Sequence, residues 1–542
     1  MNKVLLVILS CICLFIYAGY LNNGFVFDDK ILVEANPLIK SAQLLPDVFK
    51  TGIYDYWSGV QPYDRMYRPL QMLSYYLDYN LWGLNPAGFR LSNILLHLFN
   101  SILVFYLFIL LFNHKLLAGS TSILFLVHPV HISTVAYISG RGDLLSAFFI
   151  LSCCILFIKF IGSKNYLYYF LSILSAALAF LSRENALLII IFLTLISYVS
   201  TKKGAKFKYL SGFFILSAVY LLARFVILGP SGLATHTGYI NGWLAGVNFL
   251  NIIWRYVLLL LWPVNLRMFH STAFIRQLNS PELFLSLGLI LLLAAIFKWR
   301  KVKQFPAAAG FGLSWFLLGI IPVYFYFDAY PGLGRALMAE SWLYLPSIGF
   351  CAVLAYLCLL NKKGKLIILA CAAILGSLVI ANKPYWRNDV AFYERALRFL
   401  PPDSIILRNL ATAYIESGDF KNAYGAIEKL ERYYADTPVV NIAWGQYYLA
   451  RGKAQEALSY YQRILSKSFF SNFYVSLCYA KLGDFNKAIE FGRLSFGQNP
   501  FFKENVAQLA GLYGKTGQLE QANKYLLLAK QLDPRGEYVL LK

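Results

Sequence analysis

The sequence predicts an all-α protein: a bundle of about eleven membrane-spanning helices followed by a superhelix of helix-turn-helix repeats. Composition points to the membrane, because 58% of the 542 residues are hydrophobic, mean hydropathy is +0.56 and only 14% are charged. In soluble domains, charged residues usually make up about a quarter of the sequence. Apolar runs of membrane-spanning length fill the chain up to residue 383, and glycines at 418, 452, 483 and 517 then recur at near-regular spacing. We therefore expect a membrane domain over 1–383 and a repeat domain over 384–542.

The predicted spans follow the apolar runs, which are long enough to cross a bilayer. The first run follows a lone Lys3 and precedes no Ala-x-Ala cleavage pattern, so we expect a retained anchor. The runs lie near 4–21, 91–112, 117–135, 143–161, 166–182, 185–200, 208–228, 244–263, 282–299, 305–323, 343–360 and 365–383.

Charge decides the sidedness of these spans. The chain has a formal charge of +22, and lysine clusters such as Lys362, Lys363 and Lys365 lie in short loops. Such loops stay cytoplasmic by the positive-inside rule, which favours insertion over nucleic-acid binding as their explanation. The amino terminus is then inside and the repeats outside. The run at 244–263 breaks the alternation: we favour a re-entrant or interfacial segment, with two short crossings as the alternative.

Two adjacent carboxylates, Asp28 and Asp29, follow directly after the first span. An acidic pair at a membrane surface is costly unless water, a metal or a polar substrate meets it, so this pair is the leading candidate for the reactive centre. All twelve acids of residues 1–383 fall on the predicted outer side. Tolerance of acids outside the membrane explains those in loops, but not those at the ends of spans.

Arginines accompany these acids on the predicted outer face. Short spacings join Arg141 to Asp143, Arg183 to Glu184 and Arg335 to Glu340, and Arg68 adds a further guanidinium. Arginine suits phosphate because its planar fork donates bidentate hydrogen bonds, although each pair could simply neutralise itself. His128 and His131 flank Pro129, a weak metal motif that favours a structural or positioning role.

Several motifs together resemble a known family. They are Gly24 to Asp29, Tyr67-Arg68-Pro69-Leu70, His128-Pro129-Val130-His131 with Gly140 to Leu145, Glu340 with Leu343 to Phe350, and Trp254 to Asn265. This set is similar to the transmembrane and tetratricopeptide-repeat protein O-mannosyltransferases of the glycosyltransferase C superfamily. The chain departs from that pattern at Gly142, at Arg183 and at Ser341, where the family usually has Ala, Lys and Arg. The last difference leaves open which arginine meets phosphate.

The resemblance implies a membrane glycosyltransferase. It would move a sugar, a hexose such as mannose, from a polyprenyl-phosphate donor to an acceptor hydroxyl, Ser or Thr of a protein, with inversion. Asp28 takes the family's catalytic position as general base, and Asp29 positions it or binds a divalent cation, Mg or Mn. One of the arginines Arg68, Arg141, Arg183 and Arg335 would hold the phosphate, and the acids Asp143, Glu184 and Glu340 would lie beside them at the donor site. His128 and His131 would have a structural or substrate-positioning role.

The carboxy-terminal region supports the match by its own period. Each repeat glycine has a Tyr four residues before it (414, 448, 479, 513) and an Ala five after it (423, 457, 488, 522). This pattern predicts about four tetratricopeptide repeats plus a partial one at 386–402. The repeats would bind an acceptor peptide or serve as an assembly scaffold. We expect a bacterial inner membrane with periplasmic repeats, or an endoplasmic reticulum membrane with lumenal ones. A lipid-linked-sugar transporter or flippase and a non-catalytic scaffold are the alternative functions.

Overall fold

The computed structural model describes residues 3–58, 66–201, 207–229, 243–275, 281–288, 291, 307–325, 335–400, 402–464 and 468–536. By its internal contacts the chain divides into two compact units. The membrane unit comprises Met1–Gly24 and Pro86–Trp386, and the repeat unit comprises Phe25–Asn85 and Arg387–Lys542. This division differs from the predicted domains in one respect, because residues 25–85 group with the repeats.

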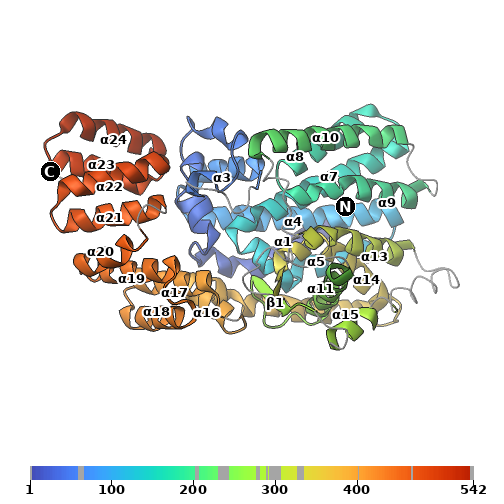
Figure 1. The fold of residues 1–542 in the computed structure, drawn as a ribbon. Coiled ribbons are helices and arrows are strands. Elements are labelled where there is room, and N and C mark those ends of the chain that lie inside the picture. Colours follow the sequence, from blue (N-terminus) through green and yellow to red (C-terminus); the bar gives the residue numbers. More distant parts are fainter. Residues whose placement is uncertain are drawn as a thin grey trace. The chain divides into compact units, whose positions relative to one another are not determined.

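The membrane unit is built from long apolar helices, labelled in Figure 1. Among the described residues, seven helical stretches are long and apolar enough to cross a membrane, or eight if the pair 115–127 and 129–135, bent by 49°, counts as one span. Three further apolar helices are shorter, at 166–180, 184–200 and 347–359, so about eleven spans stays a prediction. The helices are α1 Lys3–Tyr17, α4 Pro86–Phe112, α5 Lys115–Val127, α6 Ile132–Val135, α7 Arg141–Ser163, α8 Tyr166–Phe180, α9 Ile189–Thr201, α10 Phe207–Leu228, α11 Trp243–Leu261, α13 Ala307–Gly319, α14 Ser347–Leu359 and α15 Gly364–Ala381.

Two predicted spans need comment. Over the segment 244–263 the structure has the single unbroken helix α11, Trp243–Leu261, which is long and apolar enough to cross a membrane. Neither a re-entrant loop nor two short crossings is found within it, whereas the interfacial placement stays a prediction. Most of the run 282–299 lies outside the described residues. Several charged residues of the loops between predicted spans also lie outside the described residues. They are Lys202, Lys203, Lys206, Lys298, Arg300, Lys301, Lys303, Asp64 and Asp328.

Helices α13 and α14 pack with their backbones nearly in contact. A Cβ atom on Gly349 would collide with the carbonyl oxygen of Gly312, and a Cβ atom on Gly312 would lie 2.7 Å from the carbonyl oxygen of Gly349. Small residues allow such close approach between helices in a bilayer, where burial of apolar surface gives little driving force. These two glycines therefore fix one helix crossing of the bundle.

One small sheet interrupts the all-α fold, which is otherwise confirmed in the described residues. Strands β1 Phe269–Ala273 and β2 Arg335–Ala339 pair antiparallel, with Phe269 opposite Ala339 and Ala273 opposite Arg335. The sequence analysis did not predict these strands, because five-residue segments between apolar runs carry almost no periodic signal.

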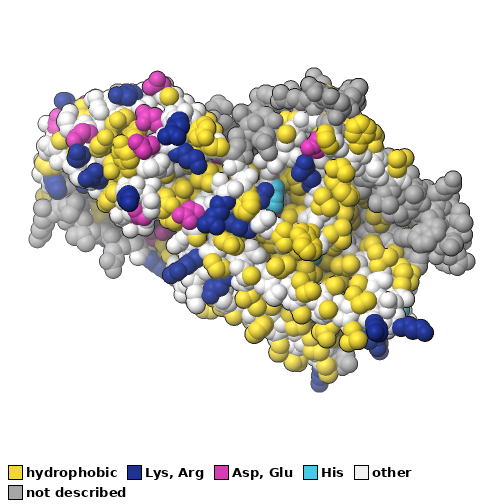
Figure 2. All heavy atoms as spheres, turned by 90° about the horizontal axis from the view of Figure 1, so that it is seen from below, with side chains coloured by type: hydrophobic (Ala, Val, Ile, Leu, Met, Phe, Trp, Pro, Cys, Tyr) yellow, Lys and Arg dark blue, Asp and Glu magenta, His cyan; other side chains and the backbone are white. Residues whose placement is uncertain are grey.

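The outer surface of the membrane unit is mainly apolar. In Figure 2, hydrophobic side chains cover most of its visible face, whereas the repeats show basic and acidic side chains interspersed. Helix α15 illustrates the apolar surface, since Leu366, Leu369 and Ile374 are each more than 60% exposed. Contiguous apolar surface of this kind suits contact with lipid.

The repeat unit contains four helix-turn-helix pairs, which follow one another in chain order from orange to red in Figure 1. A preceding helix α16, Asp389–Leu397, forms the predicted partial repeat. The pairs are α17 Ser404–Glu416 with α18 Phe420–Tyr434, α19 Pro438–Ala450 with α20 Ala454–Gln462, α21 Phe469–Lys481 with α22 Phe485–Gln498, and α23 Lys503–Lys515 with α24 Leu519–Leu532. The four glycines between paired helices have φ of 75° to 85°, which glycine adopts without steric cost.

Segment 25–85 contributes α2 Asp55–Ser58, α3 Pro69–Trp82 and several single helical turns to the repeat unit. It contacts both ends of the repeat array. Near the first repeats, Lys30 pairs with Asp389 at 2.6 Å. Near the last repeat, Lys40 pairs with Asp533 at 3.2 Å, and Leu44 packs against the apolar core of α22 to α24. The segment therefore contacts both the first helix of the array, α16, and the last helices, α22 to α24.

Candidate active site

The acidic doublet lies on a tight turn of the repeat unit, formed by Val26, Phe27, Asp28 and Asp29. The amide of Asp29 donates to the carbonyl oxygen of Val26 at 3.0 Å, and the Asp29 carboxylate accepts the amide of Val26 at 3.3 Å. Phe27 has φ of 53°, in the left-handed region that a bulky side chain rarely adopts. The turn therefore places Asp28 at its tip, in a backbone conformation that neighbouring groups must hold.

Asp28 is the accessible member of the doublet. Its side chain is partly exposed, and its carboxylate accepts a hydrogen bond from the Tyr54 hydroxyl at 2.9 Å. Burial and the adjacent Asp28 carboxylate raise the pKa of Tyr54 well above its usual value, while the charge of Arg68 opposes that rise. Tyr54 thus stays protonated and donates to Asp28. Asp28 and Arg68 act on the same tyrosine, so two of the predicted site residues are brought together.

Asp29 has a different environment. It is fully buried, and one of its carboxylate oxygens accepts the Val26 amide that closes the turn. This placement agrees with a positioning role. Among the described residues, no group of three or more His, Cys, Asp or Glu that could hold a metal is found. Mg is often bound by only one or two carboxylates together with water and substrate phosphate, so a role of Asp29 as a ligand for Mg or Mn stays a prediction.

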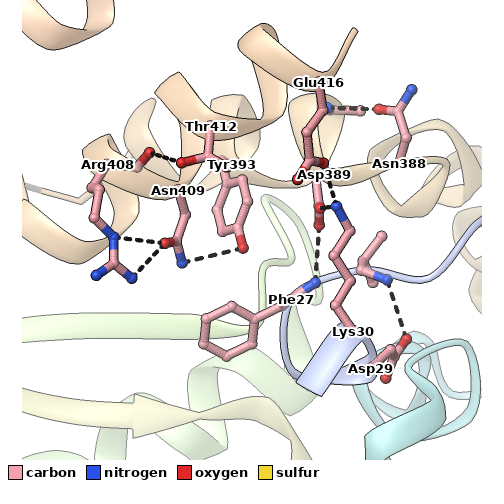
Figure 3. Close-up of polar contacts among 12 residues, drawn as sticks. Phe27, Asp29, Lys30, Asn388, Asp389, Tyr393, Arg408, Asn409, Thr412 and Glu416 are labelled. Atoms are coloured by element: carbon pink, nitrogen blue, oxygen red, sulfur yellow. Dashed lines mark hydrogen bonds and ion pairs between the residues drawn. The ribbon is translucent and has the colours of Figure 1, made fainter. Parts of the chain in front are cut away.

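A cluster of charges next to the turn joins it to the first repeats, as Figure 3 shows. Lys30 Nζ lies 2.6 Å from Asp389 of α16 and 2.7 Å from Glu416 of α17. The other oxygen of Asp389 accepts the amide of Phe27 at 2.9 Å. Burial alone would lower the pKa of Lys30, but the two carboxylates outweigh it and raise the pKa above its usual value. Lys30 is therefore a permanent positive charge beside the doublet.

In the membrane unit, Arg141 and Arg90 are buried arginines with hydrogen-bond partners that keep them in place. Arg141, at the start of α7, donates to the Asn93 side chain and to the carbonyl oxygen of Phe89 at 2.7 Å. Arg90, not singled out from the sequence, donates to the carbonyl oxygens of Ala136, Asn23 and Gly24 at 2.7 to 2.9 Å. These two arginines therefore bind the exit of the first span to α4 and α7.

The acids of the membrane unit pair across helices, in a way that differs from the short spacings noted in the sequence. Asp143 pairs with Arg183, and Glu184 lies 3.8 Å from Arg224 of α10. A helical residue faces neighbours on adjacent helices rather than the residue beside it, which explains the exchange of partners. The predicted phosphate-binding role of Arg183 stays a prediction, with its guanidinium already beside one carboxylate.

Glu340 is buried at the end of the two-stranded sheet. Its carboxylate accepts the amide of Arg267 at 2.7 Å and lies 2.7 Å from Nε2 of His270 on β1. Arg335, the expected partner, contributes backbone to β2, and its side chain lies outside the described residues. The sequence analysis missed His270 because β1 was not predicted.

His128 and His131 lie in the helical core of the membrane unit. His128 Nε2 is 3.1 Å from the carbonyl oxygen of Leu260, and His131 Nε2 is 2.8 Å from the Ser347 hydroxyl. Both rings are buried, and His131 packs against Tyr344 at 4.9 Å between centroids. Their surroundings agree with the structural role favoured from the sequence. The meeting of Asp28 with the arginines of the membrane unit stays a prediction.

The structure adds site residues that sequence reasoning missed. Tyr54, Lys30, Asp389 and Glu416 all contact the turn or its flanks. Lys30 adjoins the doublet and could have been noted, and Tyr54 lies in a Tyr-Asp-Tyr stretch typical of a polar loop. Nothing in the sequence connects Asp389 to Phe27, which is 362 residues away.

Comparisons with known proteins identify relatives of the chain. It is 27% identical to protein O-mannosyl-transferase F38B6.6 of Caenorhabditis elegans over 432 residues, covering 77% of this chain and 61% of that protein. It is 25% identical to human protein O-mannosyl-transferase TMTC4 over 489 residues, covering 76% of this chain and 64% of that protein. The chain thus spans about three fifths of the length of these relatives. No family model matches the chain.

Among solved structures, MamA of Desulfovibrio magneticus is similar to part of the chain. The match has 14% sequence identity and a TM-score of 0.24, and covers 33% of this chain and 98% of MamA. A likeness at this score says nothing about function. The resemblance predicted from the motifs is confirmed: the chain is similar to proteins named protein O-mannosyl-transferases, among them TMTC4.

Proposed function

We propose that the chain is a membrane glycosyltransferase that moves a hexose such as mannose from a polyprenyl-phosphate donor to a Ser or Thr hydroxyl of an acceptor protein. The observation that carries the proposal is the match to proteins named protein O-mannosyl-transferases over about three quarters of the chain. Apolar helices of membrane-spanning length agree with a donor whose lipid tail lies in a bilayer. The reaction would take place on the outer face of the membrane.

Asp28 is the general base of the proposed reaction. An acceptor hydroxyl must lose its proton as its oxygen attacks the anomeric carbon, and a positioned carboxylate accelerates such a step by about 10²- to 10⁴-fold. Asp28 is partly exposed, whereas Asp29 is buried and engaged with Val26. Asp28 takes the proton, the bond from sugar to phosphate breaks, and the phosphate leaves with the bonding electrons. A single displacement of this kind inverts the anomeric configuration.

Arg68 is the arginine that we assign to the departing phosphate. It influences the same tyrosine that donates to Asp28, so its charge lies close to the proposed base. A preorganised cation stabilises negative charge that grows in the transition state. Arg141 donates to Phe89 and Arg183 pairs with Asp143 within the membrane unit. These two arginines would add positive electrostatic potential on the outer face.

The inner helices of the repeats offer a surface for the acceptor. Polar side chains connect successive repeats: Thr412 of α17 donates to Gln446 of α19 at 2.9 Å, and Gln446 donates to Tyr474 of α21 at 3.2 Å. Asn409 donates to the Tyr393 hydroxyl at 3.3 Å (Figure 3), and burial, followed by the charge of Asp389, raises the pKa of Tyr393, with a smaller contribution from Asp28. Amide and hydroxyl groups in such a row can bind the backbone of an extended peptide.

We place the protein in a bacterial inner membrane with the repeats in the periplasm. An endoplasmic reticulum membrane with lumenal repeats has the same sidedness. In both locations the donor phosphate, Asp28 and the repeats share one aqueous compartment, which the proposed reaction requires. Cysteine labelling with a membrane-impermeant reagent, on full-length chain carrying a single added cysteine in the 25–85 segment, would report which side that segment occupies.

Purified full-length protein supplied with polyprenyl-phosphate mannose and Ser/Thr-containing peptides tests the activity. We expect peptides that gain one hexose, detected by mass spectrometry, with the α/β configuration opposite to that of the donor. A product that retains the donor configuration would exclude the single displacement. Movement of the lipid-linked sugar across vesicles without transfer to any peptide would replace the transferase by a transporter.

A further inference from the structure

We propose that Asp389, on helix α16 before the first full repeat, is a positioning residue that holds the catalytic turn and thereby orients Asp28. The inference rests on the proposed function, in which Asp28 is the base. It assigns to the repeats a role in catalysis itself, in addition to any contact with the acceptor. Asp389 does not touch the reacting atoms in this proposal; it acts through the backbone of Phe27.

The two carboxylate oxygens of Asp389 reach the two sides of the doublet. Oδ1 accepts the amide of Phe27 at 2.9 Å, directly before Asp28, and Oδ2 lies 2.6 Å from Nζ of Lys30, directly after Asp29. Figure 3 shows these contacts from α16 to the turn. Asp389 itself is buried, with 10% of its side chain exposed. Hydrogen bonds to an ionised, largely desolvated carboxylate are among the stronger ones in proteins.

The backbone at Phe27 needs such a partner. Its φ of 53° is unfavourable for a residue with a bulky side chain, so the turn would relax if its amide lost the bond to Asp389. The Phe27 ring also stacks on Phe392 of α16, with 5.8 Å between centroids and 26° between planes. One helix therefore binds both the amide and the ring of the residue that precedes the proposed base.

The position of Asp389 in its helix strengthens the bond. It is the first residue of α16, and the Asn388 side chain caps the helix by accepting the amide of Ala391 at 3.0 Å. A carboxylate in the first turn of a helix is stabilised by the helix dipole. The carboxylate that accepts the Phe27 amide through Oδ1 is thus stabilised by the helix end and, through Oδ2, by Lys30.

The consequence concerns the geometry of Asp28. A shift of about 1 Å in a catalytic group can cost about 10²-fold in rate. Tyr54 fixes the Asp28 carboxylate from one side at 2.9 Å, and Asp389 fixes the backbone from the other at 2.9 Å. Loss of Asp389 would leave Asp28 present but free to rotate away from the direction of attack.

The test compares variants at Asp389 with a control variant at Asp47, all in the full-length chain. Asp389→Leu removes both contacts, with Asp389→Ala as the smaller replacement should the leucine variant not fold. Asp389→Asn keeps a carbonyl oxygen that can accept the Phe27 amide. Asp47→Leu is the matched control. Asp47 lies in segment 25–85, as the catalytic turn does, and forms an exposed ion pair with Lys50 at 3.1 Å.

We expect Asp389→Leu to lower kcat by about 30-fold with the KM for the donor within about twofold. Asp389→Asn should lose less than about fivefold, and Asp47→Leu should match wild type. Adding Phe27→Gly to Asp389→Leu should restore part of kcat, because glycine adopts positive φ without cost. A merely structural role would lower thermal stability without this rescue. Equal kcat for Asp389→Leu and Asp47→Leu would overturn the proposal.

Amide hydrogen exchange of the peptide covering 25–34 separates this proposal from the proposed function. We expect faster exchange at Phe27 to Lys30 in Asp389→Leu and no change in Asp47→Leu. Unchanged exchange in Asp389→Leu would overturn the holding role, whether or not sugar transfer is seen. Faster exchange in a protein that transfers no sugar would overturn the proposed reaction and leave the holding of the turn established.

Discussion

The acidic turn of the repeat unit and the arginines of the membrane unit both concentrate charge, but the two units use that charge differently. In the turn, Asp28 is partly exposed and receives bonds that orient it. In the membrane unit, Arg90 and Arg141 are fully buried and bonded to carbonyl oxygens at helix ends. The first arrangement leaves a charged group available to a substrate. The second uses charged groups to bind helices together.

This difference separates reactive from structural charge. A buried charge without its partner is strongly destabilising, so a variant of a structural pair should fail by unfolding. An oriented, accessible carboxylate can be replaced by its amide at little cost in stability, so a variant there should fail only in catalysis. The predictions below use that contrast, from the largest expected effect to the smallest.

The first prediction concerns Asp28. Asp28→Asn should lower kcat by about 10²-fold or more, because the amide cannot take the acceptor proton. Its thermal midpoint in detergent should stay within about 2 °C of wild type. Asp47→Asn, in the exposed pair with Lys50, is the control and should keep full activity. Normal transfer by Asp28→Asn would exclude this residue as the base.

The second prediction concerns the pair of Asp143 and Arg183, whose side chains are 5% and 16% exposed. Asp143→Ala should destabilise the membrane unit by about 3–5 kcal/mol, since it leaves a largely buried guanidinium without its carboxylate. The double variant with Arg183→Ala should lose less than the sum of the two single variants. Thermal unfolding in detergent measures both effects, and strict additivity would contradict the pairing.

The third prediction concerns Asp533, which lies between Lys40 at 3.2 Å and Lys503 at 3.0 Å. Burial alone would raise the pKa of Asp533, but the two ammonium groups hold it below its ordinary 3.8. Burial and the nearby Lys503 lower the pKa of Lys40 to about 8. Asp533→Asn should therefore destabilise the repeat unit by about 2 kcal/mol, because both lysines lose their counter-charge.

The pH dependence of this effect follows from the direction of the Asp533 shift. A carboxyl whose folded pKa lies below its unfolded value stabilises the fold above about pH 4, and the stabilisation is lost as pH falls further. The difference in stability between wild type and Asp533→Asn should thus shrink below pH 4. Glu456→Gln, which alters an exposed pair with Lys453 at 3.7 Å, should show little difference at any pH.

The fourth and smallest prediction concerns Tyr54. Tyr54→Phe removes the hydroxyl that donates to Asp28 at 2.9 Å, and kcat should fall by about tenfold because the carboxylate loses one orienting bond. Stability should change little. Tyr433→Phe, at a tyrosine that is 57% exposed, is the control. A Tyr54→Phe variant as active as this control would show that Asp28 needs no second anchor.

Much of the fold could be predicted because its signals are local. The repeat period placed glycines at the turns between paired helices, and all four have the expected positive φ. Seven positions before each of these glycines the sequence has a small residue, Ala411, Gly445, Ser476 or Ala510, and all four are buried. A Cβ on Gly445, for example, would lie 2.5 Å from the Tyr461 ring. Apolar runs likewise gave the helices of the membrane unit. Period and length are properties of a short stretch, so one sequence is enough to read them.

The site was less accessible to prediction because its contacts are distant in sequence. Asp28 and Asp29 stand out beside an apolar run, but Asp389 and Glu416 contact Lys30 across more than 350 residues. The partners of Glu184 and Glu340 come from a neighbouring helix and from a strand without sequence signal. Residue type can suggest which groups react. Only the tertiary fold determines which groups hold them.

The contacts of segment 25–85 with helices α22 to α24 and the residues after them have a consequence for biosynthesis. Lys40 pairs with Asp533, 493 residues later, and the side-chain amide of Asn499 donates to the carbonyl oxygen of Tyr56, 443 residues earlier. A segment that leaves the ribosome early must therefore remain unfolded, or bound to a chaperone, until residue 533 has been synthesised. Deletion of α23 and α24 would then leave segment 25–85 open to proteolysis, although no peptide bond near it had been changed.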